Sequence, residues 1–283
     1  MPDLADLADA LLAAARKAGA DAADALAISA EDVGVGVREG ALEEAERAES
    51  VDFGLRVLIG RRQACVSASD PRPEILATLA ERAVAMAREA PEDPYCGLLD
   101  PSDLGAPVDA ATLAMDDPAG APEAAVLEKL AREAEDAARG VEGVAQVESA
   151  SASWRRSAIA LAASNGFRGG YVRASASIAA SAIAGEGLGM ETDYAYESRR
   201  RFADLPAPGE IGARAGMRAV ARLGPRKPPT GPVPVLFDRR VAPSLIGHLL
   251  SAANGAAVAR GASWLSARMG ETVLPDWADL LED

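Results

Sequence analysis

Histidine is nearly absent from this chain of 283 residues, which contains a single one, His248. A zinc hydrolase needs two or three His, Cys or carboxylate ligands held close together. The residues one helical turn from His248 are not strong ligands: Ser244, Leu245, Ser251 and Ala252. We therefore interpret His248 as a hydrogen-bonded core or interface residue, and we expect no conventional histidine-dependent active site in this chain alone.

Cysteine and aromatic residues are also scarce. Two cysteines, Cys65 and Cys96, are too few and too far apart to indicate a zinc site or a disulfide framework. The alternating apolar run around Cys65 predicts a small core residue there. Aromatic residues make up 4% of the chain, so the core must consist of small and aliphatic side chains.

Two common catalytic or nucleotide-binding motifs are missing. The chain has no Gly-x-Ser-x-Gly elbow, although a Ser-His-Asp triad of residues distant in sequence stays open. The glycines of residues 185–189 lack the strand-to-helix setting and the spacing of a dinucleotide fingerprint. The residues alone therefore predict a sheet-rich scaffold without resident catalytic machinery.

The charge balance argues against nucleic-acid binding. There are 29 basic and 43 acidic residues, a net charge of −14, and such a field repels phosphate backbones. The basic run at residues 199–201 is interpreted as a solvated strand end. No apolar stretch is long enough for a bilayer, and residues 1–19 lack the basic region of a signal peptide, so we expect a cytoplasmic protein.

Hydrophobic periodicity predicts an α+β fold, with helices packed on one face of an antiparallel sheet. Helical spacing marks four segments, and alternation marks several strands. The turns at Glu39-Gly40, at residues 60–62 and at Asn165-Gly166 separate strands. The predicted helices are residues 4–18, a segment from about residue 71, and residues 123–139 and 210–222; the predicted strands are residues 25–29, 33–37, 42–50, 51–59 and 63–69, and long runs within 144–204. Residues 91–122 predict a long surface loop.

The clearest linker is the Pro- and Gly-rich segment 224–232. It divides the chain into an N-terminal α+β domain, residues 1–223, and a second segment, residues 233–283. The second segment should contain a strand at residues 233–238 and a helix at residues 242–258. About fifty residues lie near the lower limit for an independent core. Either this segment docks on the first domain or it is the start of a truncated domain, and we favour the truncated domain.

Several stretches together resemble the TldD/PmbA family, whose members were once labelled modulators of DNA gyrase. The resemblance spans nearly the whole chain, and the order and spacing of its motifs make it fairly specific. It implies that residues 233–283 begin a β-rich C-terminal domain that is truncated here. These motifs are residues 37–44, 54–57, 164–167, 170–171, 190–204, 260–266 and 269–271.

The resemblance implies a pattern of zinc ligands that this chain does not keep. TldD-type subunits carry a His-Glu-x-x-x-His motif and act as zinc peptidases on peptides and unfolded segments, whereas PmbA or TldE-type partners lack it. Alignment places the two histidine positions at Ile246 and Ser251 and the glutamate position at Gly247, with His248 at a non-ligand position. Isoleucine cannot bind zinc and glycine cannot activate a water.

We therefore predict a non-catalytic subunit that pairs with a TldD-like, zinc-containing partner as a heterodimer and helps to hold a peptide. Self-association of this chain when that partner is missing stays open. This chain itself should carry no catalytic, metal or cofactor site. An alternative is a regulatory interaction protein without proteolysis, for example a modulator of DNA gyrase, whose acidic surface mimics nucleic acid. A third alternative is an independent hydrolase that uses a serine and His248.

Overall fold

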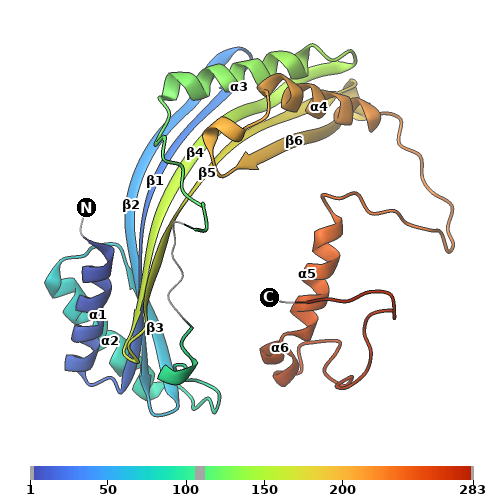
Figure 1. Ribbon diagram of the computed structural model, residues 1–283. Coiled ribbons are helices and arrows are strands. Elements are labelled where there is room, and N and C mark those ends of the chain that lie inside the picture. Colours follow the sequence, from blue (N-terminus) through green and yellow to red (C-terminus); the bar gives the residue numbers. More distant parts are fainter. Residues whose placement is uncertain (1–2, 106–111, 282–283) are drawn as a thin grey trace. The chain divides into compact units, whose positions relative to one another are not determined.

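The computed structural model describes residues 3–105 and 112–281 (Figure 1). Its contacts divide the chain into two units, Met1–Pro225 and Arg226–Asp283, which are described separately below. Part of the predicted loop 91–122, residues 106–111, lies outside the described residues. The described part of that loop contains one short 3-10 helix, Pro101–Asp103.

One six-stranded antiparallel sheet forms the frame of the first unit, in the order β3-β2-β1-β4-β5-β6. The strands are β1 (Ala22–Arg38), β2 (Ala41–Ile59), β3 (Arg62–Ala68), β4 (Val144–Ala163), β5 (Arg168–Ala184) and β6 (Glu191–Arg199). Residues 25–29 and 33–37, predicted as separate runs, are parts of the single long strand β1. Likewise, the acidic segment 42–50 and the alternating segment 51–59 form one strand, β2.

Two of the predicted turns, at Glu39-Gly40 and at Asn165-Gly166, join long strands of the sheet. Glu39 and Gly40 both have positive φ, 53° and 75°, which a two-residue turn between right-twisted strands requires. At the hairpin between β4 and β5, the side chain of Asn165 accepts a hydrogen bond from the Phe167 amide (3.1 Å) and Gly166 has φ 99°. Both predicted hairpins are therefore confirmed.

Four helices pack on the sheet: α1 (Leu4–Ala18), α2 (Pro73–Glu89), α3 (Ala124–Arg139) and α4 (Pro208–Ala221). Two more 3-10 turns, Gly187–Gly189 and Phe202–Asp204, flank β6. Helix α1 begins at the capping side chain of Asp3, which accepts hydrogen bonds from two amides, and ends at Gly19 in the left-handed conformation. Figure 1 shows α3 and α4 along the convex side of the curved sheet at one end, and α1 and α2 at the other.

The two helix pairs cover two cores on the same face of the sheet. Side chains alternate between the faces of a strand, and in β1 the helix-facing residues are Ala23, Ala25 and Ala27 at one end and Val33, Val35 and Val37 at the other. The core under α1 and α2 is centred on Leu11 and Leu55, and the core under α3 and α4 contains Trp154 and Ile211. The predicted α+β fold, with helices on one face of an antiparallel sheet, is confirmed.

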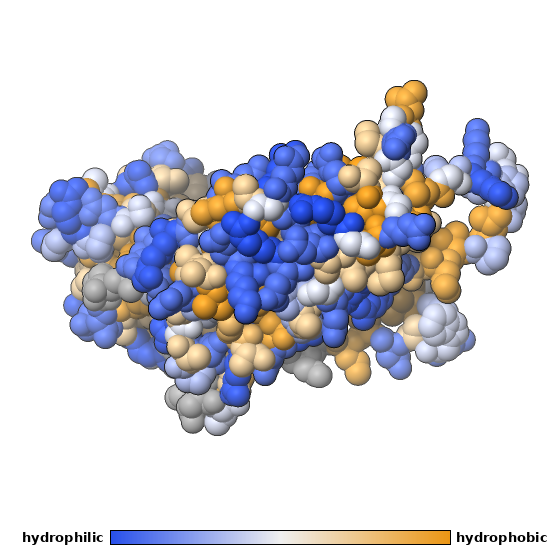
Figure 2. Space-filling model, turned by 90° about the horizontal axis from the view of Figure 1, so that it is seen from above, coloured by the Kyte–Doolittle hydropathy of each residue, from blue (hydrophilic) through white to orange (hydrophobic). Residues whose placement is uncertain are grey.

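The surface of α3 and α4 that points away from the sheet faces the viewer in Figure 2, and hydrophilic side chains predominate over its middle. Both helices are amphipathic, with alanines and a few aliphatic residues on the buried side. Small side chains let the helices lie close to each other and to the sheet. Two glycines of α4, Gly212 and Gly216, lie at the contact with α3.

A buried carboxylate fastens α3 to the first hairpin. Glu135 has no exposed surface and accepts hydrogen bonds from the Gly40 amide (2.9 and 3.2 Å) and from the guanidinium of Arg139 (2.7 Å). The guanidinium of Arg132 donates to the Gly40 carbonyl. Side chains of α3 therefore form hydrogen bonds with both the amide and the carbonyl group of Gly40, in the turn between β1 and β2.

An ion pair fastens the segment before α3 to β4. The guanidinium of Arg156 donates two hydrogen bonds of 2.9 Å to Asp116, and these lower the pKa of the Asp116 carboxyl below its ordinary value. Nearby, Asp117 is buried and accepts a hydrogen bond from the Phe202 amide (2.7 Å).

Substitution Asp116→Asn should reduce stability at neutral pH and flatten the response to acid. A carboxyl whose pKa is lower in the folded state stabilises the protein above the unfolded value, and this contribution is lost as pH falls through the folded value. The difference from the unsubstituted protein should therefore begin to shrink as pH falls below about 4 and disappear below the lowered pKa of Asp116. Both side chains are more than a third exposed, so the difference should stay below about 1 kcal/mol. Urea unfolding across this pH range would measure it, and a constant difference at all pH values would contradict the assignment.

The second unit, Arg226–Asp283, contains two helices, α5 (Ala242–Ala253) and α6 (Gly255–Ala259). The predicted single helix 242–258 is broken because the Asn254 side chain caps α6, accepting hydrogen bonds from the Ala256 and Ala257 amides. The predicted strand 233–238 is wrong: this segment is irregular, and within the described residues no strand pairs with it. An apolar stretch forms a strand when it has a neighbour for its main-chain hydrogen bonds.

Across the described ranges 3–105 and 112–281, the helices are too short or too polar to cross a bilayer.

Candidate functional site

The face of the sheet opposite the four helices, here called the open face, carries the alternate residues of each strand. In β1 these are Asp24, Leu26, Ile28, Asp32 and Gly34, among others. Figure 1 shows this face as the concave side of the curved sheet. Its side chains change character along the strands, so it offers three distinct environments.

The part beneath α3 and α4 is lined with hydroxyl and charged groups. The hydroxyls of Ser153 and Ser177 are hydrogen-bonded across β4 and β5 (2.8 Å), and Arg155 donates to both carboxylate oxygens of Asp32 (2.9 and 3.1 Å). With Glu46 and Tyr196 these residues line a hollow of about 510 Å³. Such a surface can hydrogen-bond a polar main chain.

The middle part is apolar. Leu26 lies opposite Leu161, and Ile28 opposite Ile159, which itself lies opposite Tyr171. Leu26, Leu161 and Tyr171 are each more than a third exposed. Because these exposed apolar side chains are neighbours on adjacent strands, they form a contact surface rather than isolated exceptions.

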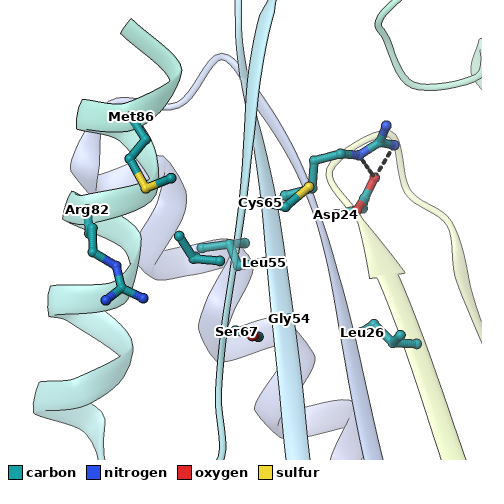
Figure 3. Close-up of a pocket in the computed structure, with 10 residues that line it drawn as sticks. Asp24, Leu26, Gly54, Leu55, Cys65, Ser67, Arg82 and Met86 are labelled. Carbon is teal, nitrogen blue, oxygen red and sulfur yellow. Dashed lines mark hydrogen bonds and ion pairs between the residues drawn. The ribbon is translucent and has the colours of Figure 1, made fainter. Parts of the chain in front are cut away.

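The third part surrounds an ion pair near the hairpin ends. The guanidinium of Arg56 donates to Oδ2 of Asp24 (2.8 Å from Nε) and to Gln63 (3.3 Å), and the Asp24 carboxylate raises the pKa of Arg56. On one side of this pair, a hollow of about 730 Å³ lies under the loop that contains Tyr95, Cys96 and Leu99. On the other side, a hollow of about 710 Å³ lies over Gly54 and reaches α2 (Figure 3).

Cys65 belongs to this third part, so its predicted place in the core is wrong. In β3, Val66 is buried and Cys65 is exposed, because Cys65 lies opposite Arg56 on the open face. The alternation correctly predicts a strand here, but Cys65 was assigned to the face that the helices cover instead of the open face. Cys65 and Cys96 are both free thiols.

The positions predicted from the zinc motif lie together on α5 of the second unit. Ile246 is 43% exposed, and a Cβ added at Gly247 would meet open space. Ser251 and His248 are also exposed, so the predicted burial of His248 in a core does not hold within this unit. Among the described residues, no three His, Cys, Asp or Glu side chains are grouped so that they could hold a metal ion.

The basic run predicted as a solvated strand end is exposed, as expected. Arg199 is the last residue of β6 and forms an ion pair with Glu197 (2.9 Å), while Arg200 and Arg201 follow it on the surface.

Three models of one family match the chain in order: PmbA/TldA metallopeptidase domain 1 at residues 23–87, the central domain at 117–223 and the C-terminal domain at 230–283. Metalloprotease PmbA of Escherichia coli O157:H7 is 30% identical over 262 residues, which is 93% of this chain. The chain belongs to the PmbA/TldD family.

A second curated relative matches the chain over a similar length. A PmbA homologue of Haemophilus influenzae, also named a metalloprotease, is 31% identical over 269 residues, 95% of this chain. The chain spans 58% and 59% of the lengths of these two curated relatives.

Solved structures share the fold. A protein of Bacteroides thetaiotaomicron described as a proposed modulator of DNA gyrase has a TM-score of 0.81 at 25% identity, over 92% of this chain and 59% of its own. TldE from Thermococcus kodakarensis has a TM-score of 0.70 at 18% identity, over 94% of this chain and 59% of its own. In this PmbA/TldD family chain, domain 1 supplies β1–β3 and the central domain β4–β6 of one continuous sheet.

Sequence reasoning did not identify the ion pair of Asp24 and Arg56 or the hollows beside it. A signal was present, because Asp24 and Arg56 are the only charged residues in the stretches 22–30 and 53–59, which otherwise contain small or apolar residues. Locating the pair also required the register between β1 and β2.

Proposed function

We propose that this chain is part of a non-catalytic subunit that pairs with a zinc-containing TldD-type peptidase. The observation that carries the proposal is the occupancy of the aligned motif positions on α5 by Ile246, Gly247 and Ser251. An isoleucine side chain has no donor atom for zinc, and glycine provides no carboxylate to activate a metal-bound water. The partner would supply the zinc and the catalytic base.

The role of this chain would be to help hold an extended peptide. A peptide can be bound through main-chain hydrogen bonds at a strand edge, with little demand for particular side chains. The first unit supports this role, since it is a long, open sheet whose face carries hydroxyl groups, small residues and an apolar band. Two free thiols are consistent with a reducing compartment, so we expect the complex in the cytoplasm.

Cleavage of an unfolded protein substrate should require both subunits. The protein and a TldD-type subunit would each be assayed alone, mixed, and mixed after removal of metal. We expect no cleavage by this protein alone, and zinc-dependent cleavage by the mixture that exceeds cleavage by the TldD-type subunit. Cleavage by this protein alone above the metal-stripped control would refute the proposal, and it would favour the metalloprotease activity for which its relatives are named.

A regulatory role without proteolysis is the rival proposal, favoured by the description of a solved relative as a proposed modulator of DNA gyrase. The net charge of −14 has the sign needed to mimic nucleic acid. A pull-down at low and moderate salt separates the two proposals. Retention of gyrase without a TldD-type subunit at both salt concentrations would favour the rival.

A further inference from the structure

Strand β3 ends the sheet on one side. It pairs with β2 through Phe53–Ile59, and within the described residues no strand lies on its other side. The outer main-chain groups of an edge strand are a template for another strand. The hollow of about 710 Å³ in Figure 3 runs from the open face around this edge to α2.

The hollow exists because Gly54 has no side chain. Gly54 lies between Leu26 of β1 and Ser67 of β3 on the open face. A Cβ added at Gly54 would meet one atom within 4 Å, the Val66 carbonyl oxygen, at an ordinary contact distance of 3.7 Å. The floor can therefore accept a larger group without displacing the main chain.

The walls of the hollow differ on its two sides. On the open face, Leu26 is 39% exposed and lies across Gly54 from Ser67 and Cys65. On the helix side, Met86 is 48% exposed, and the exposed Arg82 lies one turn before it on α2. Arg56 already pairs with Asp24, whereas Arg82 forms no ion pair with any residue that the structure describes. The unneutralised charge at the edge is therefore positive.

The other sheet edges are less suited to an added strand. The outer edge of β2 before Phe53 carries a run of charged side chains, and charged side chains protect an edge from pairing. They include Glu43, Glu44, Glu46, Arg47 and Glu49. On β6, the guanidinium of Arg218 already donates to the Tyr194 carbonyl (3.0 Å). Strand β3, between Arg62 and Ala68, has no acidic residue.

We propose that the outer edge of β3 binds an extended peptide as an added strand, with a long apolar side chain that reaches across Ser67 into the hollow over Gly54 and the adjacent carboxylate side chain at Arg82. Adjacent residues of a strand point to opposite faces. An apolar residue therefore lies across Ser67 on the open face, while its acidic neighbour points toward Arg82 and Met86. This inference rests on the proposed role in holding peptides and gives that role a location and a preference.

The test is binding of a short capped peptide in which phenylalanine and glutamate alternate, compared with one in which lysine replaces glutamate. Fluorescence anisotropy should show tighter binding of the glutamate peptide. Hydrogen exchange should show slower exchange of β3 amides when that peptide is bound. Gly54→Val fills the hollow and should weaken binding about tenfold or more. Arg82→Glu should weaken binding of the glutamate peptide and improve binding of the lysine peptide.

Matched variants separate these effects from general ones. Ala48→Val adds the same kind of side chain to the open face of β2 outside the hollow, and Lys129→Glu makes the same charge change on α3. Both should bind the peptides as the unsubstituted protein does. Thermal unfolding should show that Gly54→Val remains folded, and Arg82→Glu tests the site independently if it does not.

The inference is overturned if the two peptides bind equally, or if both Gly54→Val and Arg82→Glu leave binding unchanged. It is also overturned if β3 amides exchange equally fast with and without peptide. These outcomes do not touch partner-dependent cleavage, which tests the proposed function. Conversely, cleavage by this protein alone would refute that function even if the peptide binds at β3.

Discussion

Substitution Gly212→Ala is expected to lower the free energy of unfolding by about 3 kcal/mol, at the upper end of the cost of overpacking. A Cβ at this position of α4 would lie 1.9 Å from the Ala134 carbonyl oxygen and 2.8 Å from its carbon, both in α3. These are main-chain atoms of a regular helix and cannot move singly. The two helices would have to separate and expose part of the core beneath them. Urea unfolding monitored by circular dichroism would measure the change.

A nearby glycine of the same helix gives the control. At Gly209 the added Cβ would meet the Ala137 Cβ at 3.8 Å, an ordinary contact. Gly209→Ala should therefore leave stability unchanged or raise it by up to about 1 kcal/mol through helix propensity. Equal losses for the two variants would mean that the close approach of α3 and α4 does not depend on Gly212.

Substitution Glu135→Ala is expected to cost about 2 to 3 kcal/mol, because it removes hydrogen bonds made to a buried charge. The Gly40 amide would lose its acceptor at the first hairpin, and the methylene groups of Glu135 would leave a cavity. Glu135→Gln keeps an acceptor and should cost less. Thermal or urea unfolding would compare the three proteins.

Asp136→Ala is the matched control for Glu135. Asp136 is the next residue of α3, is 71% exposed, and approaches Arg139 at 3.7 Å. An exposed ion pair of this kind contributes less than about 1 kcal/mol. If Asp136→Ala destabilises the protein as much as Glu135→Ala does, the hydrogen bonds between Glu135 and the first hairpin are not the source of the stability.

Local patterns predicted the sheet and its helices because local chemistry determines them. The alternation of apolar residues in β2, the positive-φ turn at Glu39-Gly40 and the cap at Gly19 are each contained within a few residues. Features that depend on distant pairing were not predicted. The face of Cys65 and the strand assigned to residues 233–238 both required knowledge of a neighbouring strand.

The register between β1 and β2 shows why the third part of the open face was missed. From the turn, Arg38 pairs with Ala41, and without a bulge this register would place Asp24 opposite Leu55. The structure has a bulge between Gly36 and Val37, which places Asp24 opposite Arg56 instead. A shift of one residue decides whether the two charges share a face. No local signal in the sequence reveals that extra residue.

The motif positions on α5 came from resemblance, not from periodicity. Helical spacing alone predicts that Ile246 and Ser251 lie on one helix, but it gives no reason to compare them with zinc ligands. The family models place α5 within the C-terminal domain of a metallopeptidase family. The absence of histidine and glutamate at these positions is informative because the chain belongs to that family.

The most direct test of the central claim is the zinc content of the protein by itself. The protein would be loaded with zinc, passed through a desalting column and analysed by elemental mass spectrometry beside a TldD-type subunit treated in the same way. The account predicts zinc far below one ion per chain for this protein and about one ion per chain for the TldD-type subunit. About one tightly held zinc ion per chain of this protein would contradict it.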